Sequence, residues 1–514
     1  MRLGDILVAQ GLVSLQAVEQ AVDRQKVEGG RLGENLVALG LLTAEQLEDV
    51  LHETPVSPKT VASTGIPLGI LQSLMLKMMY VEQRESPARL AEGMRLPYNV
   101  IKTLLDDAVK KKYVQSMGTE GEGGLADIRY TLSERGRQES VEALNRSLYI
   151  GPAPVSLTAY QERTLQQRIS NEQLNAQAVR DCFSDLIVPE HFIRKIGPAV
   201  NSGHTMLLYG QPGNGKTSIA TRLAQIFQHI IYVPHCVEID GYIMQIYDAA
   251  IHKLPVGDDS GAVLARQSEA RRREDFDQRW VACRRPIVVV GGELTLDMLD
   301  LTYSEDAKFY EAPMHVKALN GTFIVDDFGR QLVSPEHLLN RWIVPMESRI
   351  DFFKLHTGKS FQIPYDQLLI FSTNLEPDDL MDPAFLRRIR YKIELYEPNR
   401  EDYRKIFEAV SRHARLELPD DIFDYVVDQL QVANDIHLAY YQPKFIVDQV
   451  IAACKYEGIP PSYSRERVSD ALRNLYVRME SAAKDVEQEQ EREAVAPSPA
   501  PAPASAPASK VEAV

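Results

Sequence analysis

Short runs of apolar residues alternate with helical patterns through the middle of the chain, from about residue 180 onward. Five of these runs have the length of a buried strand: TMLLYG (205–210), IIYVPH (230–235), TFIVDD (322–327), LLIFSTN (368–374) and YKIEL (391–395). Strands that alternate with helices favour a parallel sheet, because the crossover helices then cover its faces. The pattern therefore predicts an α/β domain at 180–398. A further apolar run at 286–292 predicts an insertion of about 255–312 between the second and third strands.

The apolar spacing stays helical after the last of these strands and predicts a helical domain at 399–480. The chain continues as EQEQERE and then as a stretch rich in proline, alanine and serine. This composition offers no apolar face that could form a core. We therefore expect a disordered tail at 481–514.

Residues 66–150 have the pattern of three short helices followed by a hairpin. Ser86 and Pro87 are typical of a helix start, and apolar positions alternate on both sides of the glycine-rich stretch GTEGEGG. This order of elements predicts a winged-helix-like domain. The stretches at 55–65 and 151–179 are expected to be linkers on either side of it.

The first 54 residues contain a sequence motif that occurs twice. RLGDILVAQGLVS begins at Arg2, and RLGENLVALGLLT begins 29 residues later, at Arg31. Each copy has the length of one helical unit, which cannot bury its apolar face alone. The repeat therefore predicts one small helical domain at 1–54, formed by the two copies together.

The composition of the chain limits the classes of protein to which it can belong. A length of 514 residues favours three or four domains, and a hydrophobic fraction of 44% is ordinary for a globular protein. The net charge of -15 argues against extensive coating of nucleic acid. The four cysteines have no paired spacing, which excludes a zinc-finger pattern and favours a reducing cytoplasm. The sequence has neither a cleavable apolar leader nor a run long enough to span a membrane, so we expect a cytoplasmic protein.

The stretch GQPGNGKT fits the phosphate-binding pattern G-x-x-x-x-G-K-[ST] and lies between a predicted strand and a predicted helix. Backbone N–H groups of such a loop face phosphate oxygens. Lys216 is expected to reach the β- and γ-phosphates of ATP, and the Thr217 hydroxyl is expected to hold Mg²⁺. The predicted nucleotide-binding residues of this loop are Gly210, Gln211, Pro212, Gly213, Asn214, Gly215, Lys216, Thr217 and Ser218.

The run TFIVDDFGR ends a predicted strand with two carboxylates. Asp326 is expected to contact the Mg²⁺ ion through its water shell, and Asp327 to polarise the attacking water. On these motifs the chain resembles the AAA+ ATPase family over roughly 180–480. That family usually ends this strand in Asp-Glu, so the shorter Asp327 implies slow turnover.

The resemblance implies roles for further residues. In FSTNLEP, Asn374 corresponds to the sensor that positions the hydrolytic water, and Lys444 stands where the family usually has a second sensor arginine. The segment MDPAFLRRIRYKIEL corresponds to the one that supplies arginine fingers, which act across a subunit interface. Its candidate residues are Arg390 and the alternatives Arg387 and Arg388. The adenine pocket would include Ile187 and Val188.

Arginine fingers acting in trans imply a ring or a filament, and a homo-hexamer is the expected form. No protease, nuclease or transferase pattern accompanies the ATPase motifs, so its output is expected to be mechanical work on a protein partner.

Two interpretations of the winged-helix-like segment stay open. In YNVIKTLLDDAVKKKYV, Asn99 and Lys102 would face a DNA groove, with lysines 110–112 near phosphates. Asp106 and Asp107 lie on the same helix, however, and the wing sequence is acidic. Because phosphate contacts supply much of the affinity for DNA, docking to a protein is the favoured interpretation and DNA binding the alternative.

The doubled motif resembles the MshEN-type N-terminal domain of type II secretion and type IV pilus assembly ATPases, in which two copies bind cyclic di-GMP. The resemblance implies that the ligand contacts Arg2, Leu3, Gly4, Leu7, Gly11 and Gln25 of the first copy and Arg31, Leu32, Gly33, Leu36 and Gly40 of the second. Cyclic di-GMP is two-fold symmetric, so a duplicated half-site suits it, and an arginine fork fits a guanine edge. A small helical docking module is the alternative.

Together these patterns predict a cyclic di-GMP-responsive AAA+ ATPase that remodels or assembles a protein partner. The alternatives are a DNA-bound regulator or loader that uses the winged helix, and a nucleotide-gated scaffold that hydrolyses ATP weakly.

Overall fold

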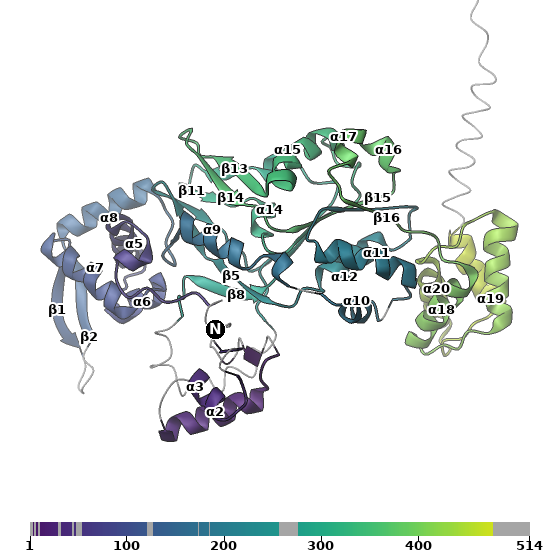
Figure 1. Cartoon of the computed structure of the whole chain (residues 1–514), viewed down its shortest axis with the longest axis horizontal. Helices are drawn as coiled ribbons and strands as arrows, with labels where there is room; N and C mark the ends of the chain where they lie inside the picture. The colour runs from purple at the N-terminus through teal and green to yellow at the C-terminus, as the bar shows by residue number, and fades with distance from the viewer. Residues whose placement is uncertain are drawn as a thin grey trace, which may run out of the picture. The chain divides into compact units, whose positions relative to one another are not determined.

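The computed structural model describes residues 4, 7–8, 11–28, 32–43, 46–47, 54–120, 127–172, 174–184, 186–255 and 276–475. The chain divides into two compact units, Met1–Tyr396 and Glu397–Val514 (Figure 1). The predicted α/β domain lies in the first unit, and the predicted helical domain lies in the second.

A five-stranded parallel sheet forms the centre of the first unit, with the strand order β16-β4-β15-β12-β9. Its members are β4 (Met206–Tyr209), β9 (Ile287–Val290), β12 (Thr322–Val325), β15 (Leu368–Thr373) and β16 (Tyr391–Glu394). Four of the five predicted strands are confirmed as members of this sheet. Their short, largely buried sequences are those expected of parallel strands with helices on both faces.

Neighbouring side chains of one strand point to opposite faces of the core sheet. Leu208 packs in one apolar cluster with α11 (Glu190–Asn201) and α12 (Lys216–Ala224). Leu207, the residue before it, packs in another cluster with α15 (Pro335–Ser348). Figure 1 shows the sheet between α15 on one side and α11 and α12 on the other. The core is therefore a three-layer α/β/α arrangement.

The second predicted core strand is wrong. Ile230–Pro234 forms β5, which pairs antiparallel with β8 (Trp280–Arg284) in a separate two-stranded sheet. Its expected place in the core sheet is taken by β9, so the run at 286–292 is not part of an insertion as the range 255–312 implied. Both runs are short and apolar, and hydrophobic pattern does not tell which strand a run will pair with.

A second five-stranded sheet has the order β10-β11-β7-β6-β3 and was not predicted. Its strands have two to four residues each, too short for a clear alternation of apolar and polar positions: β3 (Val155–Ser156), β6 (Cys236–Ile239), β7 (Tyr242–Gln245), β10 (Thr302–Ser304) and β11 (Phe309–Glu311). Residues 151–179, expected to be a linker, hold β3, α9 (Leu157–Gln166), η2 (Ile169–Asn171) and the start of α10 (Ala176–Cys182).

Residues 68–132 follow the expected order of three helices and a hairpin. The elements are α5 (Leu68–Val81), α6 (Pro87–Met94), α7 (Tyr98–Lys110), β1 (Val114–Glu120) and β2 (Asp127–Leu132). The Ser86 side chain accepts a hydrogen bond from the backbone N–H of Arg89, which caps α6 as its sequence suggests. α8 (Glu134–Arg146) follows the hairpin and packs on α5.

The doubled motif folds the same way in both copies. Gly11 and Gly40 have left-handed backbones with φ of +69° and +68°. The leucine after each glycine donates its N–H to the carbonyl of Leu7 or Leu36, at 2.9 Å and 3.0 Å. The helices α2 (Leu15–Glu28) and α3 (Leu32–Ala38) pack on each other. The sequence repeat is therefore also a repeat of backbone geometry.

The glycines of the repeated Arg-Leu-Gly triplets have matching surroundings. A Cβ atom on Gly4 would lie 2.8 Å from Val18, and one on Gly33 would lie 2.6 Å from Leu47. Each of these partners lies 14 residues after its glycine. Since neither distance leaves room for a methyl group, the glycines allow close packing inside each copy.

The second unit contains α18 (Arg400–His413), α19 (Asp420–Val427), the π-helical turn η4 (Asp428–Ala433) and α20 (Gln442–Glu457). Tyr403, Phe407 and Phe423 form the centre of its apolar core. The remaining elements of the first unit are η1 (Ala62–Thr64), η3 (Asp297–Leu299), α14 (Met314–Lys317), the hairpin β13 (Ile350–Lys354) and β14 (Ser360–Pro364), α16 (Pro377–Leu380) and α17 (Pro383–Leu386). Among the described residues, no helix has the length and apolar character that crossing a bilayer requires.

Candidate nucleotide site

The predicted phosphate-binding loop joins the end of β4 to the start of α12, as its sequence requires. Gly210, Gly213 and Gly215 have φ of +135°, +84° and +76°, conformations that favour glycine. A Cβ atom on Gly210 would lie 2.5 Å from the carbonyl oxygen of Leu395. The glycine pattern is therefore set by the backbone path of the loop.

Lys216 begins α12 and turns its amine back over the loop. Its Nζ donates hydrogen bonds to the carbonyl oxygens of Gly210 and Gln211, both at 2.8 Å. Burial lowers the pKa of Lys216, while Asp326 and Asp327 act in the opposite direction. The ammonium group is thus held close to two carboxylates and above the N-terminus of a helix, a place that suits phosphate.

Thr217 and Asp326 meet although they are far apart in the sequence. The Thr217 hydroxyl donates a hydrogen bond of 2.7 Å to Oδ2 of Asp326. A hydroxyl beside a carboxylate is a donor set that suits Mg²⁺, which prefers oxygen ligands and completes its shell with water and phosphate oxygens. Because nucleotide and water supply most of that shell, a magnesium site here needs no cluster of acidic residues, and the described residues contain no such cluster.

Asp327 and Asn374 also lie together at the carboxyl ends of neighbouring strands β12 and β15. The Asn374 side-chain amide donates to Oδ1 of Asp327 at 3.3 Å. Asp327 has a left-handed backbone with φ of +47°, which aspartate tolerates better than most residues. The structure thus brings together the predicted phosphate lysine, the magnesium ligands and the two water-positioning groups.

The other predicted loop residues differ in their surroundings. The Asn214 side chain is buried, and its amide donates to the carbonyl oxygen of Leu395 at 3.1 Å, which ties the loop to the end of β16. Gln211, Pro212 and Ser218 are exposed. The binding surface of the loop is therefore formed by its backbone and not by these side chains.

The predicted adenine-pocket residues lie just before α11. Ile187 and Val188 are half-buried, and Val188 packs against the apolar cluster that contains Ile219 of α12. Lys444, the predicted second sensor, lies in the first turn of α20 in the second unit and is exposed.

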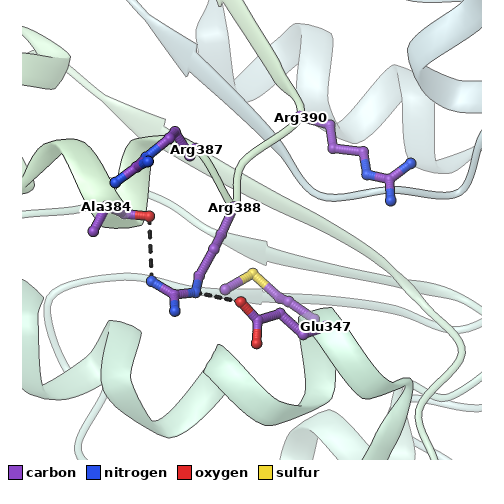
Figure 2. A pocket seen from close by; sticks show the side chains of 6 residues that line it. Glu347, Ala384, Arg387, Arg388 and Arg390 are labelled. Carbon is purple, nitrogen blue, oxygen red and sulfur yellow. Dashed lines mark hydrogen bonds and ion pairs between the residues drawn. The ribbon is translucent and has the colours of Figure 1, made fainter.

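The three candidate finger arginines line one open pocket of about 540 Å³, together with Met346, Glu347 and Ala384. Figure 2 shows that Arg388 turns toward Glu347, to which its Nε donates at 2.6 Å, whereas Arg390 points away from them. Arg387 donates to the carbonyl oxygen of Pro383 at 3.3 Å. Arg390 is exposed, and its guanidinium has no hydrogen-bond or ion-pair partner among the residues that the structure describes. Of the three, Arg390 is the side chain free to act on another molecule.

Of the predicted cyclic di-GMP residues, Arg2, Leu3 and Arg31 lie outside the described residues. Leu7 and Leu36 are completely buried, and Gly4, Leu32 and Gly33 are buried with them. Gly11 and Gly40 are exposed, and Gln25 is half-buried. The described motif residues therefore include both the core of the repeat and exposed turns at the helix ends.

Two of the predicted DNA-facing side chains, Asn99 of α7 and Lys111 just after this helix, have partners inside the protein. Asn99 donates to the carbonyl oxygen of Lys59 at 2.6 Å. Lys111 forms an ion pair of 2.7 Å with Asp107 and donates to Gln72 at 2.8 Å. These contacts reduce the positive charge and the donors that α7 could offer to DNA.

Sequence reasoning missed Gln331, which contacts the turn that holds both carboxylates. Its amide donates to the carbonyl oxygens of Asp326 and Asp327 at 3.1 Å and 3.3 Å. The only signal in the sequence is its position in DDFGRQ, four residues after Asp327 and beside a glycine turn.

Comparison with known proteins agrees with this geometry. Residues 182–238 match the family described as magnesium chelatase, subunit ChlI, and residues 399–474 match a domain of unknown function, DUF8689. No curated protein matches the chain. The chain has a P-loop between β4 and α12 of a parallel α/β core. The magnesium chelatase match covers the P-loop itself, and the same core brings Thr217 of that loop to Asp326.

Solved structures with some likeness share 13% sequence identity with the chain. The RuvB Holliday junction branch migration motor of Thermotoga maritima has a TM-score of 0.33, and the match covers 58% of this chain and 74% of that one. NtrX from Brucella abortus has a TM-score of 0.33, with 56% of this chain and 55% of that one covered.

Proposed function

We propose that the chain is an ATPase that binds Mg-ATP at the P-loop and hydrolyses it to remodel or assemble a protein partner. The observation that supports this most directly is the hydrogen bond of 2.7 Å between Thr217 and Asp326, which brings together, from two distant motifs, the groups that we propose to hold Mg²⁺. Lys216 lies over the loop in position to exchange its two carbonyl partners for phosphate oxygens.

Each group has one role in this proposal. Backbone N–H groups of the loop and Lys216 bind the phosphates, and Thr217 and Asp326 hold the metal. The metal, when bound, neutralises charge on the β- and γ-phosphates. Asp327 polarises the attacking water, and Asn374 orients that water and the carboxylate. The free guanidinium of Arg390 acts on the γ-phosphate of a neighbouring copy, which implies a ring, for which we propose a homo-hexamer.

The test is steady-state ATP hydrolysis by the full chain and by Lys216→Ala. We expect the variant to lose nucleotide binding and with it all turnover above background. Lys195→Ala, an exposed lysine of α11, is the matched control and should hydrolyse ATP at the wild-type rate. Equal turnover by wild type and Lys216→Ala would overturn the proposal. Nucleotide binding without turnover would favour the weakly hydrolysing scaffold.

We further propose that the tandem helical unit at 1–54 binds cyclic di-GMP and gates the ATPase. The matching backbone geometry at Gly11 and Gly40 supports a duplicated site, because a two-fold symmetric ligand needs two equivalent surfaces. In this proposal Arg2 and Arg31 each present a guanidinium fork to one guanine.

Calorimetric titration of cyclic di-GMP into the full chain tests this second proposal. Arg2→Ala and Arg31→Ala should each abolish or strongly weaken binding. Arg24→Ala, on α2 and not among the predicted ligand residues, should leave binding unchanged, since Arg24 is occupied by an ion pair of 2.8 Å with Glu28. If the intact protein binds no cyclic di-GMP, the unit is a docking module instead.

For the winged-helix-like segment we propose docking to a protein rather than to DNA. The internal contacts of Asn99 and Lys111 support this choice. Fluorescence anisotropy with a labelled DNA duplex at physiological salt should show no binding. Binding that weakens steeply with salt would favour the DNA-bound regulator or loader.

A further inference from the structure

Gln331 is a buried amide at the edge of the candidate nucleotide site. It lies in the loop between β12 and α15, and only 9% of its surface is exposed. Its Oε1 accepts a hydrogen bond of 2.8 Å from the backbone N–H of Gly329. Its Nε2 donates to the carbonyl oxygens of Asp326, Asp327 and Gly291 at 3.1, 3.3 and 3.2 Å. The amide therefore acts both as a hydrogen-bond donor and as an acceptor, and it makes four contacts with the backbone.

These contacts surround Asp327, one of the non-glycine residues with a positive φ. Asp327 has a left-handed backbone, and such strain persists only where neighbouring groups hold it. On the other side of the turn, the Phe328 N–H donates to the carbonyl oxygen of Ser372 at 2.7 Å. Thr373 donates its hydroxyl to the carbonyl oxygen of Phe328, also at 2.7 Å. The turn is thus fixed on one side to β15, by a backbone hydrogen bond and by the Thr373 hydroxyl. On its other side the turn is held by Gln331.

Gln331 also joins two neighbouring strand ends of the core sheet. Gly291 directly follows β9, while Asp326 directly follows β12, and the same amide donates to the carbonyl oxygens of both. The N–H of Gly291 is in turn bonded to the Glu293 carboxylate at 2.8 Å. A movement of the segment after β9 would therefore be transmitted through Gln331 to the turn that holds the two carboxylates.

We propose that Gln331 is a positioning residue for ATP hydrolysis, which holds the Asp327 carboxylate in the direction of the attacking water. This inference rests on the proposed ATPase function. Gln331 would act through the backbone on either side of Asp327, with which its amide forms hydrogen bonds. A side chain of the same size that cannot donate hydrogen bonds would leave the loop folded and the carboxylate poorly aimed.

The experiment compares Gln331→Glu with the wild type in steady-state ATP hydrolysis. Glutamate has the same shape but cannot donate to the carbonyl oxygens when ionised. We expect kcat to fall by about tenfold or more and the KM for ATP to change by less than about twofold, because only a transition-state contact is misplaced. Leu332→Ala is the control, since this neighbour is 89% exposed. Gln331→Met, which is uncharged and of similar length, replaces the first variant if that one does not fold.

A kcat within about twofold of the wild type in a folded variant would overturn the proposal. If Gln331 had only a structural role, the variant would instead have a lower melting temperature, and its kcat below that temperature would equal that of the wild type. If the wild type itself shows no turnover above Lys216→Ala, the proposed ATPase function fails first. The structural part of the proposal, that Gln331 holds the turn at Asp327, is then tested separately by amide hydrogen exchange at Phe328 and Gly329. Exchange faster in Gln331→Glu by about tenfold would support it, and unchanged exchange would refute it.

Discussion

Asp327 combines an unusual backbone with a proposed chemical role. Its φ of +47° turns the chain after β12, so that its carboxylate meets the Asn374 amide at 3.3 Å instead of continuing along the strand. The AAA+ family that the sequence motifs resemble usually has the longer glutamate at the end of the corresponding strand. In this chain the turn at Asp327 brings the shorter side chain to Asn374, which is how an aspartate can serve the proposed role.

Asp327→Asn should lower kcat for ATP hydrolysis by roughly 10²-fold or more, because an amide cannot polarise the attacking water. Asparagine tolerates the left-handed backbone as well as aspartate does, so the turn should persist. Nucleotide affinity, measured by equilibrium binding, should stay within about twofold. Asp378→Asn, an exposed aspartate of α16, is the matched control. An unchanged kcat in Asp327→Asn would show that another group polarises the water.

His204 provides a second test at the scale of one residue. Its Nδ1 faces the Arg349 guanidinium at 2.7 Å, and burial, followed by the charges of Arg349 and Arg390, lowers its pKa to about 4. An unfolded histidine titrates near pH 6.5. The folded state thus binds fewer protons between these values, so the contribution of His204 to stability is present above about pH 6.5 and is lost as the pH falls toward 4.

We therefore expect His204→Gln to reduce the loss of stability on acidification. The free energy of unfolding, measured by denaturant titration at pH 7.5 and pH 5, should differ less in this variant than in the wild type. His191→Gln, at an exposed position of α11, should retain the wild-type difference. An undiminished difference in His204→Gln would assign the acid sensitivity to other groups.

At the scale of one element, the phosphate-binding loop depends on Gly210. The φ of +135° and the 2.5 Å approach of the Leu395 carbonyl oxygen both exclude a side chain. Gly210→Ala should abolish nucleotide binding and lower stability by about 1–3 kcal/mol, the range for a strained backbone. Gly241→Ala separates the two effects, because Gly241 also has a positive φ, +88°, but has open space where a Cβ would lie. That control should bind nucleotide normally; thermal shift with and without Mg-ATP measures both quantities.

The elements differ in how far the sequence could predict them. Sequence motifs predict the P-loop, the two carboxylates after β12 and Asn374 after β15, because the chemistry of phosphate, metal and water fixes their residue types. β5 was assigned to the wrong sheet, because β5 and β9 are both short apolar runs and only tertiary pairing distinguishes them. The second sheet was missed, since strands of two to four residues carry no periodicity. Gln331 was missed for a related reason: its role arises from contacts that no local pattern encodes.

At the scale of the whole molecule, the proposed activity depends on contacts between copies. Arg388 is neutralised within its own chain by Glu347, while Arg390 is exposed and has no partner in the described part of the chain. An unpartnered guanidinium beside an open pocket fits a finger that stabilises the γ-phosphate charge of a neighbour. The P-loop and the finger then belong to two different copies of the chain, and each active site is shared.

A shared site can be rebuilt from two defective chains. Lys216→Ala lacks the phosphate lysine and keeps Arg390, whereas Arg390→Ala keeps the P-loop and lacks the finger, so each variant alone should be nearly inactive. In an equal mixture that assembles at random, about one quarter of the interfaces join an intact P-loop to an intact finger. We expect the mixture to recover a corresponding part of wild-type ATPase activity. Arg388→Ala should need no such rescue. If mixing restores nothing although the variants assemble together, Arg390 acts within its own chain or has no part in the reaction.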